Sequence, residues 1–139
     1  ERAAELGATE TVVNDHGLES RLESLVPGGF DVVAEVTGRT DVLEQAFSYV
    51  RPRGRVWVFG VCPADARASF VPYDVFRKDL SVIGSFAVCR TFRESIALIR
   101  SGAIQVEPLI SHRLPLDRFS EGLELAERAS DRMKIQFEL

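Results

Sequence analysis

The sequence predicts an α/β fold with a doubly wound parallel sheet, and two observations lead to this prediction. Segments with apolar residues at helical spacing alternate with short apolar runs, in the order helix, strand, helix, strand, helix, strand, loop, strand, helix. The runs 30–36, 56–61 and 80–86 contain few polar residues, which is typical of strands covered on both faces. Right-handed crossovers between these strands would place helices on both faces of the sheet.

The elements in the first part of the chain follow from local signals. Residues 1–7 are predicted to be the last turns of a helix, because good helix formers precede Gly7. The β-branched run 10–13 is expected to be a short strand. Apolar residues at helical spacing predict a helix over 18–26 and another over 40–50.

The last part of the chain is expected to differ in structure from the first part. Residues 64–74 are polar and irregular, and a helix is predicted over 91–100. Residues 106–114 are predicted to be extended edge structure, followed by a helix over 117–129. The stretch 133–139 alternates apolar and polar residues, as half-exposed strands do. We expect this last part to belong to a different packing layer from the parallel sheet.

Composition and charge argue against several classes of function. The chain of 139 residues is long enough for one domain with a core, and its formal net charge of −4 argues against nucleic-acid binding. The apolar runs are far shorter than the roughly 20 residues that span a bilayer, and we see no signal-peptide pattern, so no membrane association is expected. Cys62 and Cys89 form no disulfide or metal-binding pattern, and a cytoplasmic setting is therefore expected.

Three phrases of the sequence, taken in order, carry a resemblance to a known family. They are the segments 35–40 (EVTGRT), 54–61 (GRVWVFGV) and 76–86 (FRKDLSVIGSF). The segments 3–8 and 108–116 fit the same family. Together they resemble the zinc-dependent medium-chain alcohol dehydrogenases, in the branch that contains the polyol (sorbitol) and threonine dehydrogenases.

The resemblance implies a partial Rossmann fold. The chain would contain the third to sixth strands of a doubly wound parallel sheet, followed by a C-terminal return segment to the catalytic domain. Residues 1–104 would form the partial NAD(P)-binding Rossmann domain, and residues 105–139 would pack with a catalytic domain that lies outside this chain. Because the strand order is 3-2-1-4-5-6, the first two strands belong in the middle of the sheet. We therefore expect that this segment does not fold natively on its own.

The resemblance also implies where a cofactor binds, because ligands of open α/β sheets lie at the carboxyl ends of the strands. The strand end 36–38 would border the adenine side of the cofactor, and 59–61 would line the nicotinamide ring. The strand end 85–87 would meet the carboxamide through its backbone, and Lys134 is a candidate contact of the pyrophosphate. The predicted cofactor-binding residues are Val36, Thr37, Gly38, Phe59, Gly60, Val61, Ser85, Phe86, Ala87 and Lys134.

Each of these predicted sites has a plain structural alternative. A strand-to-helix turn at 36–38 needs its glycine as much as a ligand site does. The segment 59–61 could be a buried strand end with a turn glycine, and 85–87 an ordinary edge strand. Lys134 could be a solvated lysine on an amphipathic strand.

No catalytic or metal-binding residue is predicted in this chain. His16 and His112 have no cysteine or second histidine at ligand spacing, whereas catalytic zinc needs about three protein ligands. Glu35 is interpreted as a structural, hydrogen-bonding carboxylate rather than a general base, because no proton-relay partner is visible. The zinc ligands and the glycine-rich phosphate turn are expected upstream of this segment. The cofactor is expected to be NAD or NADP, with NAD favoured.

These inferences predict the cofactor-binding portion of an oxidoreductase. The intact, zinc-dependent protein would transfer hydride between a secondary alcohol or polyol and NAD(P), and the segment alone would be inactive. Two alternatives are a zinc-free medium-chain enone or quinone reductase and a non-catalytic Rossmann-like binding module. A homodimer or tetramer is expected, formed through the edge strand 80–86.

Overall fold

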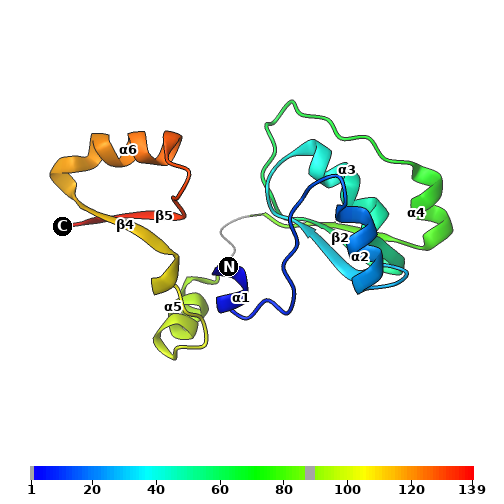
Figure 1. Cartoon of the computed structure of the whole chain (residues 1–139), viewed down its shortest axis with the longest axis horizontal. Helices are drawn as coiled ribbons and strands as arrows, with labels where there is room; N and C mark the ends of the chain where they lie inside the picture. Colours follow the sequence, from blue (N-terminus) through cyan, green and yellow to red (C-terminus); the bar gives the residue numbers. More distant parts are fainter. Residues whose placement is uncertain (1, 87–89) are drawn as a thin grey trace. The chain divides into compact units, whose positions relative to one another are not determined.

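The computed structural model describes residues 2–86 and 90–139, and the chain divides into two compact units (Figure 1). The first unit is Glu1–Cys89 and the second is Arg90–Leu139. The predicted site residue Ala87 lies outside the described residues. The domain boundary predicted after residue 104 stays a prediction.

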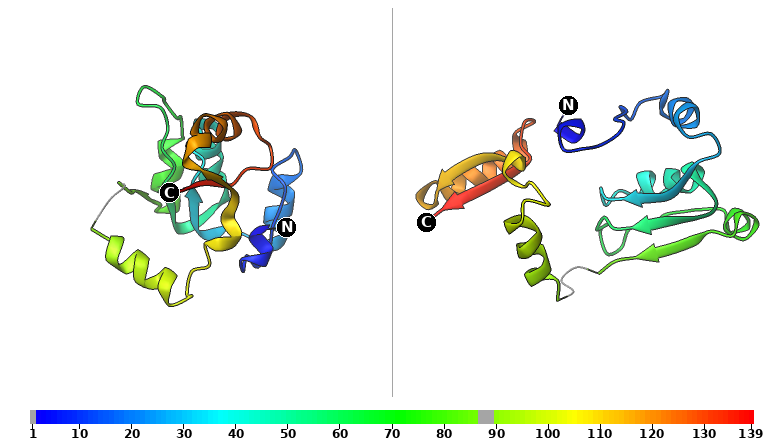
Figure 2. Two further views of the ribbon diagram at one scale, coloured as in Figure 1. Left: turned by 90° about the vertical axis from the view of Figure 1, so that its left-hand side faces the viewer. Right: turned by 90° about the horizontal axis from the view of Figure 1, so that it is seen from below.

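The first unit is built on a parallel three-stranded sheet, which confirms the predicted fold class (Figure 2). Its strands are β1 (Phe30–Glu35), β2 (Val50–Val58) and β3 (Ser81–Gly84), in the order β1-β2-β3. Glu35 pairs with Val58, and Val58 pairs with Gly84. The carboxyl ends of all three strands therefore lie together along one edge of the sheet.

The described residues of the first unit form four helices: α1 (Arg2–Glu5), α2 (Leu18–Leu25), α3 (Thr40–Tyr49) and α4 (Pro72–Lys78). The predicted helices at the start, at 18–26 and at 40–50 are thus present. Helix α1 is followed by Gly7 at a φ of +100°, in the left-handed region that a glycine after a helix provides.

The core of the first unit lies between α3 and the sheet. Ala46 of α3 packs with Val50 and Val56 of β2, and each of these residues is at most 2% exposed. Burying one such valine side chain contributes roughly 1.5–3 kcal/mol. On the opposite face of the sheet, Val32 and Ile83 stay nearly half exposed. The sheet is therefore stabilised mainly from the α3 side.

The prediction of a strand over residues 10–13 was wrong, because these residues form no strand in the structure. Val12 and Val13 are exposed instead. A strand needs a neighbour to satisfy its backbone N–H and C=O groups. Among the described residues of the first unit, β1 is an edge of the sheet, and no strand lies beside residues 10–13 to pair with them. The sheet consequently has three of the four strands that were predicted.

Two other boundaries differ from the prediction. Residues 64–74 were predicted to be irregular throughout, but α4 begins at Pro72, a residue well suited to the first helical position. The helix is closed by Asp79, whose φ of 52° ends the helical path. Strand β2 begins at Val50 and ends at Val58, so residues 59–61 follow the strand rather than belong to it.

The second unit contains a separate parallel sheet of two strands, β4 (Ile110–Pro115) and β5 (Lys134–Glu138). The predicted strand at 133–139 and its separation from the larger sheet are confirmed. The remaining elements, in chain order, are α5 (Phe92–Arg100), η1 (Glu107–Leu109), η2 (Leu116–Arg118) and α6 (Phe119–Arg128). The short helix η1 replaces the first part of the predicted extended segment 106–114.

Helix α6 covers one face of the small sheet. The rings of Phe119 and Phe137 lie with centroids 5.0 Å apart. Gly122 lets the helix approach closely, because a Cβ there would lie 2.3 Å from the Phe137 ring. Among the helices of residues 2–86 and 90–139, none is long and apolar enough to cross a membrane.

Candidate functional site

The carboxyl edge of the three-stranded sheet gathers the predicted site segments of the first unit. The backbone N–H groups of Phe59 and Gly60 both donate to the carbonyl oxygen of Glu35, at 3.0 and 2.7 Å. The N–H of Ser85 donates to the carbonyl oxygen of Val58 at 3.2 Å. The segments that follow β1, β2 and β3 therefore lie side by side.

Two glycines allow the first two of these segments to touch. Gly38 has a φ of +72°, and a Cβ on it would lie 2.4 Å from the carbonyl oxygen of Val61. A Cβ on Gly60 would lie 2.3 Å from the backbone nitrogen of Gly38. Any side chain at either position would force the two segments apart. Both glycines were predicted site residues, and the structure brings them into direct contact.

A buried carboxylate lies beneath this contact. Glu35 is 1% exposed, and its Oε1 accepts hydrogen bonds from the N–H and hydroxyl of Thr37, both at 2.5 Å, and from the N–H of Gly38 at 2.9 Å. Burial raises the pKa of Glu35, but the hydrogen bonds from Thr37 and Gly38 and the nearby backbone N–H of Arg39 lower it, and the balance lies below the ordinary value. Glu35 is therefore ionised at neutral pH and acts as a structural hydrogen-bonding carboxylate, as predicted.

The ends of β2 and β3 are joined by a side-chain contact that was not predicted from the sequence. The indole Nε1 of Trp57 donates to the hydroxyl of Ser85 at 2.6 Å. The Trp57 and Phe59 rings meet edge to face, with centroids 5.1 Å apart. Only the register of β2 with β3 identifies Ser85 as the partner of Trp57.

Several apolar side chains at this edge remain exposed. The predicted site residues Val36, Phe59, Val61 and Phe86 are 63%, 52%, 87% and 96% exposed, respectively. Exposed apolar side chains next to convergent backbone polar groups are the usual lining of a small-molecule site. The edge can thus offer flat apolar surface to a ring and hydrogen-bonding backbone groups to its polar substituents.

Lys134, the remaining predicted contact, is exposed at the start of β5 in the second unit. The hydroxyl of Ser111 donates to its carbonyl oxygen at 3.1 Å. Its role towards a pyrophosphate stays a prediction.

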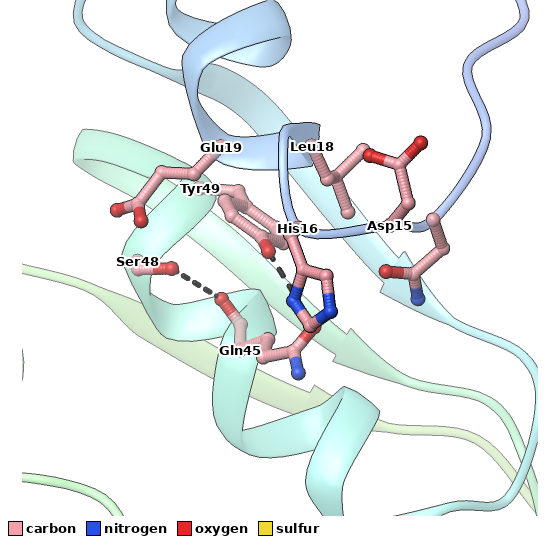
Figure 3. A pocket seen from close by; sticks show the side chains of 8 residues that line it. Asp15, His16, Leu18, Glu19, Gln45, Ser48 and Tyr49 are labelled. Atoms are coloured by element: carbon pink, nitrogen blue, oxygen red, sulfur yellow. Dashed lines mark hydrogen bonds between the residues drawn. The ribbon is translucent and has the colours of Figure 1, made fainter.

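His16 lines a pocket between the start of α2 and the C-terminal half of α3 (Figure 3). Gln45 and Tyr49 of α3 and Glu19 of α2 line the same pocket. Hydrogen bonds from Arg21 and from the N–H of Gly17 hold the pKa of the adjacent Asp15 below its usual value. Within the described part of the chain, no three histidine, cysteine or acidic side chains gather in a way that could hold a metal ion.

Comparison with known proteins places this geometry in a family. Residues 1–101 match the family model described as zinc-binding dehydrogenase. D-arabinitol dehydrogenase 1 of Uromyces fabae is 33% identical over 70% of this chain and 28% of its own length. Further matches include dehydrogenases of D-altritol, L-threonine and sorbitol.

Solved structures agree with this match. A zinc-binding dehydrogenase structure from Sinorhizobium meliloti 1021, bound to NADP, has a TM-score of 0.84 and 31% identity and covers 96% of this chain and 40% of its own. An alcohol dehydrogenase from E. coli CFT073 with NADH has a TM-score of 0.88 over 99% of this chain and 41% of its own, at 18% identity, and supports the fold alone. The chain thus spans less than half the length of these relatives. With most of its residues matched, the chain belongs to the zinc-binding dehydrogenase family.

Proposed function

We propose that this chain is the cofactor-binding part of a zinc-dependent dehydrogenase that transfers hydride between a secondary alcohol or polyol and NAD(P). The observation that carries the proposal is the contact between the strand ends at Gly38 and Gly60. It forms a narrow edge lined by exposed apolar side chains, where parallel α/β sheets bind their ligands. The polyol dehydrogenases among its relatives support the class of substrate.

Each segment of this edge would contact a different part of the cofactor. Residues 36–38 would border the adenine side, and 59–61 would flank the nicotinamide ring, where a glycine leaves room for it. The backbone of 85–87 would bind the carboxamide, and Lys134 would contact the pyrophosphate. We propose NAD as the favoured cofactor, although solved relatives have bound NADP or NADH.

The residues of this chain would hold and orient the cofactor. Zinc, bound by residues outside this chain, would supply a Lewis acid that polarises the alcohol oxygen. The apolar side chains of Phe59 and Val61 would exclude water from one side of the ring, and the backbone would fix its orientation. By itself the segment would bind no zinc and catalyse no hydride transfer.

Cofactor binding and turnover test the proposal separately in the intact protein. We expect NADH fluorescence titration to show binding before and after treatment with a zinc chelator. Polyol-dependent reduction of NAD should disappear on chelation and return with zinc. Turnover that survives chelation, with an enone or quinone as substrate, would instead support a zinc-free reductase. Binding without turnover on either class would support a non-catalytic binding module.

We also propose that β3 pairs with a second copy of the chain. It is the last strand in the order β1-β2-β3, and Val82 is 47% exposed. Because the N–H of Ser85 points to β2, strand alternation directs the N–H of Val82 away from β2. Val82→Pro would remove that donor and leave the β2 pairing intact. Light scattering of the intact protein should show dissociation for Val82→Pro but not for Val82→Ala, and an unchanged oligomer in both variants would refute the β3 interface.

A further inference from the structure

We propose that Glu35 is a positioning residue that sets the spacing of the cofactor-binding edge by tying together the segments after β1 and β2. The inference rests on the proposed function, because it assigns the edge to a nicotinamide cofactor. Glu35 itself need not touch that cofactor. Its effect would pass through the two segments that it holds.

The side chain of Glu35 fixes the first segment. Its Oε1 alone accepts the N–H and hydroxyl of Thr37 and the N–H of Gly38. Successive backbone N–H groups that converge in this way form a concave anion-binding turn. In many strand-to-helix turns a ligand phosphate fills such a site. Here a carboxylate of the protein fills it, so the turn is closed to phosphate and is left to border an uncharged part of the ligand.

The backbone of the same residue fixes the second segment. The carbonyl oxygen of Glu35 accepts both the N–H of Phe59 and the N–H of Gly60. One residue thereby holds five donors, three through its side chain and two through its carbonyl oxygen, from the two segments that meet at Gly38 and Gly60. A change at Glu35 is therefore transmitted to both sides of the edge.

The second carboxylate oxygen of Glu35 explains why the contact between Gly38 and Gly60 tolerates no added side chain. Oε2 is buried without a hydrogen-bond partner in the described structure, and a Cβ on Gly60 would lie 2.6 Å from it. Buried polar atoms without partners are unfavourable and rare, and they concentrate where position matters. The carboxylate therefore packs directly against Gly60 as well as binding Thr37 and Gly38.

The test compares Glu35→Gln with Asp31→Asn in the intact protein. Both variants remove one negative charge from β1, but Asp31 lies at the amino end of the strand, where it pairs with Arg51. We expect Glu35→Gln to raise the Kd for NADH and the KM for NAD roughly tenfold with little change in kcat, because charge-assisted bonds to the turn are weakened. Asp31→Asn should change both constants less than about twofold.

Gly60→Ala provides a second route to the same result, because it separates the two segments while leaving the Glu35 charge in place. It should raise the Kd for NADH at least as much as Glu35→Gln does. If the wild type binds NADH and both variants bind it within twofold, while thermal stability falls, Glu35 is only structural and the inference is overturned. Wild-type protein that binds neither NADH nor NADPH would instead overturn the proposed function, and this inference with it.

Discussion

Strand β1 carries two carboxylates on the same face, and they contribute to the fold in different ways. Asp31, at the amino end, is exposed and forms an ion pair with Arg51. Glu35, at the carboxyl end, is 1% exposed and binds backbone and hydroxyl donors rather than a cation. An exposed ion pair contributes about 0–1 kcal/mol, whereas a buried acceptor whose loss leaves several donors unpaired contributes more. Burial and the nature of the donors, rather than the charge alone, decide what each acid contributes.

Removing the Glu35 side chain should cause the largest loss of stability. Glu35→Ala would leave the N–H and hydroxyl of Thr37 and the N–H of Gly38 without their shared acceptor. We expect the free energy of unfolding of the intact protein to fall by about 3 kcal/mol or more. Urea denaturation measures the change, and a loss as small as that of Asp31→Ala would contradict it.

Adding a side chain where the two glycines meet should cause the next largest loss of stability. Gly38→Ala would place a Cβ 2.4 Å from the carbonyl oxygen of Val61, in addition to the strain of a positive φ. Gly28→Ala is a matched control, because Gly28 also has a positive φ but a Cβ added there would meet no atom within 4 Å. We expect about 1 kcal/mol of destabilisation at Gly28 and about 3 kcal/mol at Gly38. Equal losses in urea denaturation would show that the contact with Val61 is easily relieved.

Acid should reduce the advantage that wild-type Glu35 has over an amide. Burial raises its pKa in the folded protein, but the hydrogen bonds from Thr37 and Gly38 and the nearby N–H of Arg39 outweigh burial, so the pKa lies below the ordinary value of 4.5. The ionised form therefore stabilises the fold above that value, and the contribution is lost as pH falls through the folded pKa. The difference in unfolding free energy between wild type and Glu35→Gln should be constant near neutral pH and shrink below about pH 4. If the difference instead grew towards acid pH, the protonated form of Glu35 would be the stabilising one, and the prediction would be wrong.

The smallest effect is expected at the other end of the strand. Asp31→Asn should cost at most about 1 kcal/mol, because the Arg51 pair is exposed to solvent. Added salt should reduce that cost further by screening the pair. A loss that is larger or insensitive to salt would mean that the two acids of β1 are equivalent after all.

Local sequence signals predicted much of the fold, and the family resemblance pointed to part of the candidate site. The apolar runs at 30–36 and 80–86 and the helical spacing over 40–50 each correspond to an observed element, because their partners lie within the chain. Gly38 and Gly60 were singled out by the family resemblance, at predicted strand ends, and they do meet.

What the sequence could not predict depends on neighbours distant along the chain. Residues 10–13 have the composition of a strand but lack a strand to pair with. The bond from Trp57 to Ser85 follows only from the register of β2 and β3. The double role of Glu35 likewise needed the distance from its carbonyl oxygen to Gly60, which no local pattern contains.

The open side of β1 has a practical consequence for anyone who prepares these 139 residues alone. Because the carbonyl oxygen of Glu35 points to β2, strand alternation turns the backbone groups of Val32 and Ala34 away from it. Among the described residues no strand lies on that side of β1, and such an open edge, next to an exposed valine, is a template for strands of other molecules. We expect the isolated polypeptide to self-associate into insoluble material during expression, with β1 as the growing surface.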